Sequence, residues 1–460
     1  MAFILSIVLA RVLLPEQYGT ISLVLVFINL ANVFVTSGFG ESLIQEKDSS
    51  DREFSTMFYC SIVMSIALYI LLYLTAPQIA RFYKNDQLIP IIRVLSLQVP
   101  LGGIKTIQNA YIIKNMMFKK FFFSTLGGTF ISGMIGIMLA FKGFGVWALV
   151  AQNLTNSIID MLVLFIIVPW RPTCYFNFQI AKNLFAYGWK LTVAQFLNTF
   201  YGNIRNLFIG KIYSEVDLAY YNRGDQFPNL IINNINTSIS TVLFPAMVLE
   251  SVDTLRLKSL TRRAMKTSSY LVFPIMTGLM AVSEPLIRVL LTDKWLPAVP
   301  YLFISCVYWM FQPSQTANAQ VIKALGESSL YLKLEIIKKI IGMGLLIGSL
   351  RYGVLMIAIS NIALAMISML INIFPNKRLI HYGYFEQIGD LLPTLVISIL
   401  MGVIVYFEKM LPVNILLLLI IQMVSGVLIY LGLSIISRND SYLYLKKFGL
   451  EKINYKKMNN

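Results

Sequence analysis

Residues 411–436 read LPVNILLLLIIQMVSGVLIYLGLSII and contain no charged side chain. A helix needs about 20 mainly apolar residues to cross the hydrocarbon core of a bilayer, so this stretch predicts a membrane-spanning helix. It decides the class of fold because similar windows follow one another along nearly the whole chain. The other windows are 2–14, 18–39, 55–80, 89–113, 121–141, 145–170, 185–212, 226–249, 268–291, 299–322, 331–350, 353–374 and 388–407. We therefore expect an all-α, polytopic membrane helix bundle with about fourteen spans.

The composition of the chain supports this class. Of the 460 residues, 57% are hydrophobic and 13% are charged, whereas about a quarter of the residues of a soluble domain are charged. The connectors between the windows are short, so we expect no extramembrane catalytic domain. The three cysteines have no C-x-x-C spacing and the only histidine, His381, lies in a connector. We expect no cofactor and no metal site, and we expect that the protein is not an enzyme.

The first window is shorter than a span. Only nine residues separate Met1 from Arg11, fewer than the roughly 20 that cross a bilayer. We therefore expect that an upstream part of the first helix is missing.

The net charge of +16 is distributed unevenly. Alternate connectors carry clusters of Lys and Arg, the pattern that marks cytoplasmic loops, while the intervening connectors carry few. The basic set is Lys114, Lys119, Lys120, Arg171, Lys182, Arg256, Lys258, Arg262, Arg263, Lys266, Lys323, Lys333, Lys377, Arg378 and five lysines after residue 445. We expect both termini in the cytoplasm, these charges to be solvated near anionic headgroups, and no nucleic-acid partner.

Two pairs of segments indicate an internal duplication. Residues 109–114 (NAYIIK) match 318–323 (NAQVIK), and residues 9–12 (LARV) match 209–212 (IGKI). Six predicted spans separate the members of each pair, so the repeats are parallel and would place a site at their interface near the midplane. We expect an N-terminal lobe at 1–170, a C-terminal lobe at 171–380, two additional helices at 381–436 and a basic cytoplasmic tail at 437–460.

Polar side chains recur on single faces of several predicted spans. The longest stripe has intervals of four, three, four, three and four residues, which fall on one face of a helix. It comprises Asn222, Gln226, Asn229, Asn233, Asn236 and Ser240. Shorter sets are Ser22, Asn29 and Thr36; Gln98, Gly102, Lys105 and Asn109; Gln195, Asn198, Gly202, Arg205 and Asn206; and Gln312, Gln315 and Asn318. A single amide is more often an interhelical hydrogen bond, whereas a six-position stripe indicates a water-filled cavity.

Ionisable side chains at membrane depth are functional candidates. Most of them are cationic, which suits a ligand with phosphate or acidic sugars, because Arg and Lys form charge-assisted hydrogen bonds to phosphate. The predicted substrate cavity comprises Lys105, Arg205, Arg223, Asn109, Asn198, Asn229, Asn233 and Asn318. Asp160 and Glu284 are the candidates for ion coupling or for balancing one of these cations.

A series of stretches resembles a known family. They are LARVLLPEQYG (9–19), GFG (38–40), LIQ (43–45), APQIARFY (76–83), LSL (95–97), GFGVWALVAQ (143–152), YGW (187–189), NLFIGK (206–211) and FPA (244–246). Their order and spacing, more than any one motif, resemble the polysaccharide transporters of the O-antigen flippase type in lipopolysaccharide biosynthesis. That family belongs to the multidrug/oligosaccharidyl-lipid/polysaccharide exporter superfamily, which includes the multidrug and toxin extrusion (MATE) antiporters.

The resemblance implies a function and a location. It implies a two-lobed, MATE-like bundle of fourteen helices that moves an undecaprenyl-diphosphate-linked oligosaccharide to the outer leaflet of the bacterial inner membrane by alternating access. It also implies membrane lipids, a polysaccharide polymerase and a chain-length regulator as partners, and a monomer.

Two other classes stay open at this point. An ion-coupled drug antiporter of the same fold would use intramembrane carboxylates, for which Asp160 and Glu284 are the candidates. A membrane glycosyltransferase or polymerase would need acidic residues on large outer loops, and the outer connectors are short.

Overall fold

The computed structural model describes residues 2–45, 50–444 and 446–447 of the chain, and in these residues all regular secondary structure is helical. The all-α fold class is confirmed. The chain divides into two compact units, Met1–Ala219 and Tyr220–Asn460, which we call unit 1 and unit 2 and describe separately.

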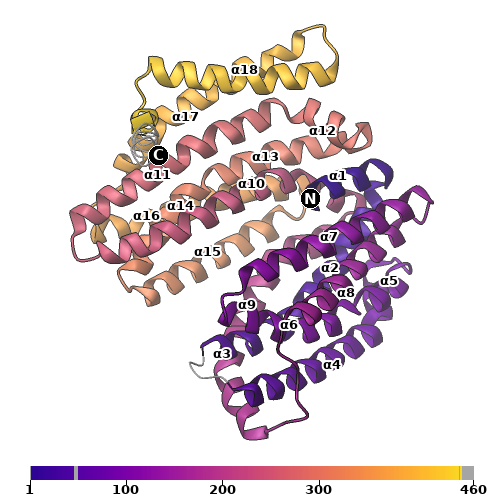
Figure 1. Cartoon of the computed structure of the whole chain (residues 1–460). Helices are drawn as coiled ribbons and strands as arrows, with labels where there is room; N and C mark the ends of the chain where they lie inside the picture. Colours follow the sequence, from indigo (N-terminus) through magenta and orange to yellow (C-terminus); the bar gives the residue numbers. More distant parts are fainter. Residues whose placement is uncertain (1, 46–49, 445, 448–460) are drawn as a thin grey trace, which may run out of the picture. The chain divides into compact units, whose positions relative to one another are not determined.

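Unit 1 contains nine helices and the start of a tenth among its described residues (Figure 1). They are α1 (Ala2–Val12), α2 (Pro15–Thr36), α3 (Phe39–Gln45), α4 (Asp51–Tyr83), α5 (Leu88–Leu95), α6 (Gln98–Lys114), α7 (Phe118–Phe141), α8 (Val146–Ile167), α9 (Phe178–Ile212) and the first turn of α10 (Glu215–Leu249). The starts follow local capping rules: Pro15 occupies the first turn of α2, and Asn177 caps α9 by accepting hydrogen bonds from the next turn.

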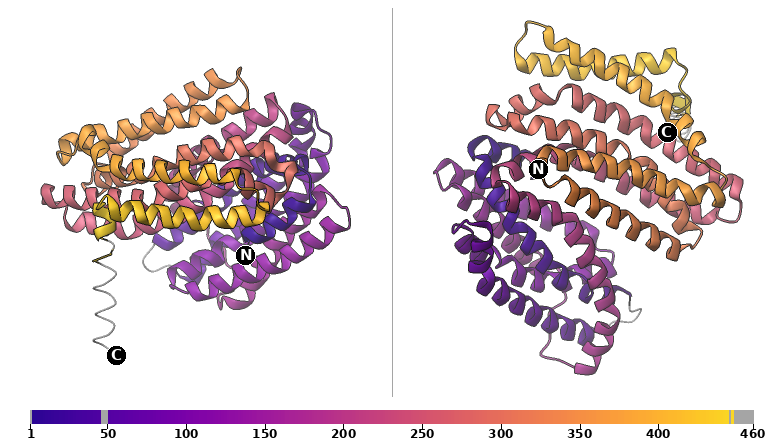
Figure 2. Two further views of the ribbon diagram at one scale, coloured as in Figure 1. Left: turned by 90° about the horizontal axis from the view of Figure 1, so that it is seen from above. Right: turned by 180° about the vertical axis from the view of Figure 1, so that it is seen from behind.

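Unit 2 contains the rest of α10 and the helices that follow it. They are α11 (Thr254–Ala281), α12 (Ser283–Leu291), α13 (Val299–Met310), α14 (Gln312–Ala324), α15 (Ser328–Ser349), α16 (Val354–Leu379), α17 (Tyr384–Phe407) and α18 (Ile415–Ile436), with short 3₁₀ turns at Asp293–Ala298 and Glu408–Met410. Helices α17 and α18, at the orange to yellow end of the colour scale, lie side by side in Figures 1 and 2.

Every predicted window coincides with one helix or with two consecutive helices. Eight helical segments in the described residues are long and apolar enough to cross a membrane, or nine if the bent pair α11 and α12, at 72°, forms one span. The window at 299–322 is broken at Phe311, shortly before Pro313, because a proline cannot donate the helical hydrogen bond that a continuous helix requires there. The lobe boundaries at residues 170 and 380 stay predictions, since compact units show which residues pack together and not which helices repeat.

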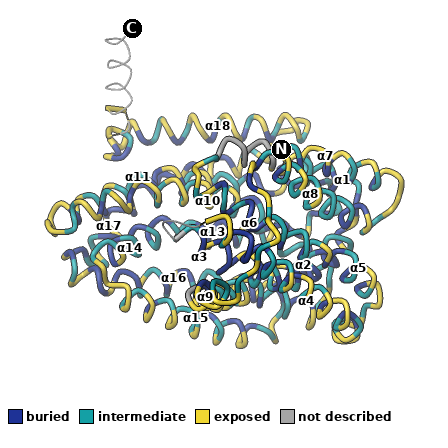
Figure 3. Tube along the Cα trace, turned by 60° about the horizontal axis from the view of Figure 1, so that its bottom comes forward, coloured by how far each residue is buried: buried dark blue, intermediate teal, exposed yellow. Residues whose placement is uncertain are grey.

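The outer helices expose apolar side chains, as helices in lipid must. On α18 the buried residues are Leu419, Gln422, Gly426, Tyr430 and Ser434, which lie on one face. Its other faces expose leucines, isoleucines and valines, and Figure 3 shows exposed residues recurring along its length. A helix that buries one stripe and exposes apolar residues elsewhere packs on protein with that stripe and faces lipid with the rest.

Candidate functional site

The first candidate region lies in unit 1, where α2 packs against α6, α8 and α9. Lys105 of α6 forms an ion pair with Asp160 of α8, with 2.7 Å between Nζ and Oδ2. Their side chains are 29% and 14% exposed, so the pair is largely withdrawn from solvent. The Asp160 carboxylate thus lies against the Lys105 ammonium, and its role in charge balance or ion coupling stays a prediction.

Several buried polar atoms of unit 1 have no hydrogen-bond partner in the described part of the chain. They include Oδ1 of Asn32, Oδ1 of Asn109, both amide atoms of Gln108, and Nε of Arg205. Buried polar groups are nearly always hydrogen-bonded, so a group of exceptions needs an explanation such as a ligand or bound water. Asn32 borders the α6 face that carries Lys105, because a Cβ added at Gly102 would lie 3.1 Å from Asn32 Oδ1.

Arg205 differs from Lys105 in having no acidic partner. Among the described residues no carboxylate lies within 4.0 Å of its guanidinium, and its Cζ lies 5.8 Å from the ring centroid of Tyr201. A charge at membrane depth without a protein partner is costly. Arg205 and the partnerless amide oxygens of Asn32 and Asn109 together form what we call the open polar set. Asn198, on the same helix as Arg205, is exposed.

Both ends of α2 are in contact with other segments of unit 1. At its start, Thr20 and the amide of Asn85 donate hydrogen bonds to the Glu215 carboxylate at the beginning of α10. At its end, Thr192 Oγ1 donates to the carbonyl of Ser37 at 2.8 Å. Gly38 and Gly188 meet there so closely that a Cβ on Gly188 would lie 2.6 Å from the Gly38 carbonyl oxygen, and Gly38 has φ +93°. We call these the Glu215 contact and the Gly38–Gly188 contact.

The long polar stripe of α10 lies in unit 2, where two of its members, Asn229 and Asn233, are hydrogen-bonded and the buried amide oxygen of Asn236 has no partner in the described residues. Asn233 Nδ2 donates a hydrogen bond to Asn229 Oδ1. Asn229 in turn donates through its Nδ2 to Asp225 Oδ2 at 3.1 Å. Trp309 Nε1 of α13 donates to the other oxygen, Asp225 Oδ1, at 2.8 Å. Sequence reasoning missed Asp225 because the predicted span began at residue 226. Asp225 lies three residues after Asn222 and four before Asn229, so its position on the polar face of the helix could have revealed it.

The other predicted residues of unit 2 have protein partners. Arg223 is buried, its guanidinium lies 5.1 Å from the ring centroid of Trp295, and it donates to Gln226. Glu284 is exposed and pairs with Arg288 at 3.1 Å one turn away, and its role in ion coupling or charge balance stays a prediction.

Asn318 of α14 is fully buried and contacts side chains of α16 and α17. Its Nδ2 donates to Gln387 Oε1 at 2.8 Å, and its Oδ1 accepts from Gln387 Nε2 at 3.0 Å and from Asn376 Nδ2 at 2.7 Å. This closed set of amides holds three helices together, the role that single amides most often have in membrane bundles. A cavity role for Asn318 stays a prediction.

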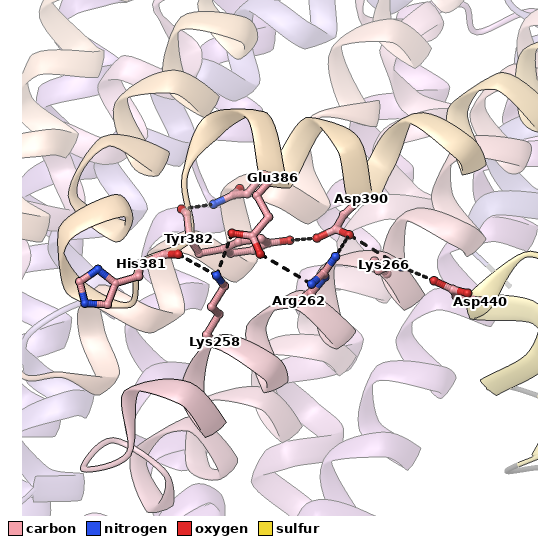
Figure 4. A network of polar contacts seen from close by, with 9 residues as sticks. Lys258, Arg262, Lys266, His381, Tyr382, Glu386, Asp390 and Asp440 are labelled. Atoms are coloured by element: carbon pink, nitrogen blue, oxygen red, sulfur yellow. Dashed lines mark hydrogen bonds and ion pairs between the residues drawn. The ribbon is translucent and has the colours of Figure 1, made fainter.

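A network of ion pairs joins α11 to α17 (Figure 4). Lys258, Arg262 and Lys266 recur every four residues and form one row on α11. Lys258 pairs with Glu386 at 2.8 Å, and Arg262 pairs with Asp390 at 2.5 Å. The three charges were expected to be solvated, and Arg262 is exposed, but all three are also paired with carboxylates, which was not predicted. The sequence could not show it, because the carboxylates that face them lie more than 120 residues away.

Two further contacts complete this network, which we call the α11–α17 ion network. Lys266 pairs with Asp440, beyond α18, at 2.7 Å. Tyr382 donates a hydrogen bond of 2.7 Å to Asp390 Oδ2, and its burial, together with the Asp390 carboxylate, raises the pKa of the Tyr382 phenol.

Comparisons with known proteins agree with this fold. The family model described as polysaccharide biosynthesis protein matches residues 8–300. The chain is 26% identical over 307 residues to the teichuronic acid biosynthesis protein TuaB of Bacillus subtilis (strain 168), covering 65% of this chain and 62% of that protein. It is 23% identical over 414 residues to the lipopolysaccharide biosynthesis protein WzxC of Escherichia coli (strain K12), covering 86% of this chain and 83% of that protein.

Solved structures show the same fold. The lipid II flippase MurJ in an inward closed conformation matches with a TM-score of 0.76 at 20% identity, covering 95% of this chain and 97% of that one. An inward-facing MATE-family multidrug transporter matches with a TM-score of 0.64 at 14% identity, covering 82% of this chain and 95% of that one. The chain is therefore a multi-pass membrane protein with a transporter fold.

Proposed function

This chain belongs to the polysaccharide biosynthesis protein family, and from that premise we propose that it is a flippase for a lipid-linked oligosaccharide. In this proposal it carries an undecaprenyl-diphosphate-linked repeat unit from the cytoplasmic to the outer leaflet of the bacterial inner membrane, with both termini in the cytoplasm.

The open polar set is the observation that carries the proposal. Arg205 has no acidic partner in the described residues, and its Nε is buried without a hydrogen bond. A diphosphate would supply both the negative charge and the acceptor oxygens that this guanidinium lacks. The partnerless amide oxygens of Asn32 and Asn109 would accept hydrogen bonds from sugar hydroxyls. Lys105 contributes less net charge to the ligand, because Asp160 already neutralises it.

Alternating access would act on the two closed ends of α2. Opening one end requires the Glu215 contact to break, and opening the other requires Gly38 and Gly188 to separate. In this proposal the ligand shifts the equilibrium because its diphosphate binds more tightly in a state in which Arg205 can be reached.

Complementation of a chromosomal deletion tests the function. We expect the deletion strain to accumulate lipid-linked repeat units on the cytoplasmic face, and the wild-type chain to relieve this. Arg205→Ala should restore less than about a tenth of the flux, since losing a charge-assisted contact costs at least about 1.4 kcal/mol. Arg351→Ala, which removes an exposed connector arginine, is the matched control and should complement fully. Full complementation by Arg205→Ala at equal membrane abundance would contradict the site, and normal repeat-unit levels in the deletion strain would contradict the function.

A second candidate is an ion-coupled small-molecule antiporter, and Asp225 favours it. Its carboxylate accepts hydrogen bonds only from the neutral Trp309 and Asn229, and no Lys or Arg nitrogen of the described chain lies within 4.0 Å of it. A carboxylate inside a membrane span without a counter-charge among the described residues is a candidate site for a coupling ion. Altered drug resistance with unchanged lipid-linked repeat units in the deletion strain would decide for this candidate.

A further inference from the structure

An aromatic pocket lies in unit 1, at the opposite end of α9 from Arg205. It forms where α4, the N-terminal part of α9 and the connector at 168–177 meet, and it has a volume of about 1140 Å³. Its walls include Tyr59, Phe176, Phe185 and Trp189. Of the described residues that line it, Lys182 is the only charged one. The pocket thus combines apolar walls with a single positive charge.

Hydrogen bonds fix the connector that forms one wall. Ser55 Oγ of α4 lies 2.9 Å from Thr173 Oγ1 and accepts a hydrogen bond from the Thr173 backbone N–H at 3.0 Å. The guanidinium of Arg52 lies 5.1 Å from the ring centroid of Tyr175, another lining residue. The pocket is therefore built into the fold and does not need a ligand to assemble it.

The depth of the pocket suits a lipid chain. Helix α4 has 33 residues, about 50 Å at 1.5 Å per residue, which is longer than the roughly 30 Å hydrocarbon core. The α4 lining residues run from Tyr59 to Ala67, about 12 to 24 Å from the start of the helix. This end is the one that the basic connectors predict to face the cytoplasm. The pocket would then extend from the headgroup level into the hydrocarbon of one leaflet, with Lys182 near the phosphates.

We propose that this pocket binds an anionic phospholipid, with a hydrocarbon chain between the aromatic walls and the phosphate at Lys182. Its charge favours this occupant, because a cation without a lining carboxylate attracts an anionic headgroup. The closed Gly38–Gly188 contact favours a membrane lipid over the transported substrate. Gly188 lies between the lining residues Phe185 and Trp189, and a Cβ on it would lie 2.6 Å from the Gly38 carbonyl oxygen, so no sugar headgroup passes between the two backbones at this point.

The bound lipid has a consequence for the closed state. A chain packed on Phe185 and Trp189 supports the segment of α9 that carries Gly188. It therefore stabilises the Gly38–Gly188 contact and makes closure of this end sensitive to the lipid composition of the membrane.

Native mass spectrometry of the purified full chain tests the proposal. The protein is exchanged into detergent with phosphatidylglycerol or phosphatidylethanolamine, and bound lipid is counted by titration. We expect one phosphatidylglycerol per chain to bind more tightly than phosphatidylethanolamine. Lys182→Gln should weaken phosphatidylglycerol binding about fivefold, the share of one lysine near an anionic headgroup. Lys190→Gln is the matched control, because it removes the same charge from the same helix at a residue that does not line the pocket.

A second pair of variants tests the apolar wall. Trp189→Ala should weaken binding of both lipids, and Trp147→Ala, at an exposed tryptophan of α8, should leave it unchanged. Equal effects of Lys182→Gln and Lys190→Gln would overturn the proposal. Displacement of phosphatidylglycerol by equimolar undecaprenyl diphosphate would also overturn it and assign the pocket to the substrate. Because this assay measures binding and not flux, its failure leaves the complementation result standing.

Discussion

The α11–α17 ion network of unit 2 and the open polar set of unit 1 differ in whether their positive charges have carboxylate partners. Lys258, Arg262 and Lys266 each have a carboxylate within 4.0 Å, and Asp390 also accepts a hydrogen bond from Tyr382. Arg205 has no carboxylate within that distance in the described residues. Charges that the protein satisfies itself hold helices together, whereas charges that it leaves without a partner are available to a ligand. The comparison predicts that stability and transport are separable, with the first in the ion network and the second in the open polar set.

The largest effect on stability should come from Asp390→Ala. The Asp390 side chain is 5% exposed, and its loss leaves the Tyr382 hydroxyl without its acceptor and Arg262 with only the 3.6 Å contact to Glu386. Breaking a buried ion pair from one side costs about 3 to 5 kcal/mol, and the 44% exposure of the Arg262 side chain places this pair at the low end of that range. We expect a loss of about 3 kcal/mol in the free energy of unfolding, measured by denaturant titration in detergent. Asp253→Ala removes a half-exposed carboxylate at the start of the same helix α11 and serves as a control that should cost about 1 kcal/mol through its cap. Equal losses for the two variants would contradict a structural role for the network.

The ion network also shows what sequence reasoning could not reach. The apolar windows located the helices because a bilayer imposes a length and a composition on each span. The row Lys258, Arg262 and Lys266 is visible in the sequence, but the positive-inside rule already accounts for it. Its partners Glu386 and Asp390 come from a different helix, and only the tertiary packing of α11 on α17 shows that these charges are paired.

The candidate site was predictable to a similar degree. Polar periodicity and intramembrane charge marked Lys105 and Arg205, because both are signals within one helix. Whether a marked residue has a counter-charge depends on other helices, so the sequence did not separate Lys105, which is paired with Asp160, from Arg205, which has no carboxylate within 4.0 Å in the described residues. For the same reason the predicted list combined Asn318, which is closed in by other amides, with Asn109, whose oxygen has no partner in the described residues.

Asp160→Asn in unit 1 should have an intermediate effect. It leaves Lys105 without its counter-charge, but the Lys105 side chain is 29% exposed and can reach water. We expect a loss of about 1 to 2 kcal/mol, between the values for exposed and buried pairs. Adding Lys105→Met should restore most of the stability, because the pair is then replaced and not broken. If the double variant is no more stable than the single one, Asp160 has a role other than balancing Lys105.

Arg205→Met tests the opposite side of the comparison. Removing a guanidinium whose Nε has no hydrogen bond should change the free energy of unfolding by less than about 0.5 kcal/mol, while transport in the complementation assay is lost. Arg205→Lys should recover only part of the transport, because an ammonium cannot bind a diphosphate in the bidentate geometry of a guanidinium. A destabilisation as large as that of Asp390→Ala would show that Arg205 is a structural residue after all.

The smallest effect should appear at the rim of the ion network, in the pH dependence of Asp440. The hydrogen bond and positive charge of Lys266 lower the pKa of Asp440 below its usual value. A carboxylate whose pKa is lower in the folded state stabilises the fold at pH values above its unfolded pKa of about 3.9, and this contribution is lost as the pH falls through the folded pKa. The Asp440 side chain is 78% exposed, so solvent limits the contribution to a few tenths of a kcal/mol. We therefore expect the unfolding curves of Asp440→Asn and the wild type to differ slightly at pH 7 and to converge as the pH falls through the lowered pKa of Asp440. Asp390→Ala should stay destabilised at pH 7 in high salt. A large, salt-resistant effect of Asp440→Asn would show that the network extends beyond the buried contacts of Asp390 and is held together equally by its exposed end.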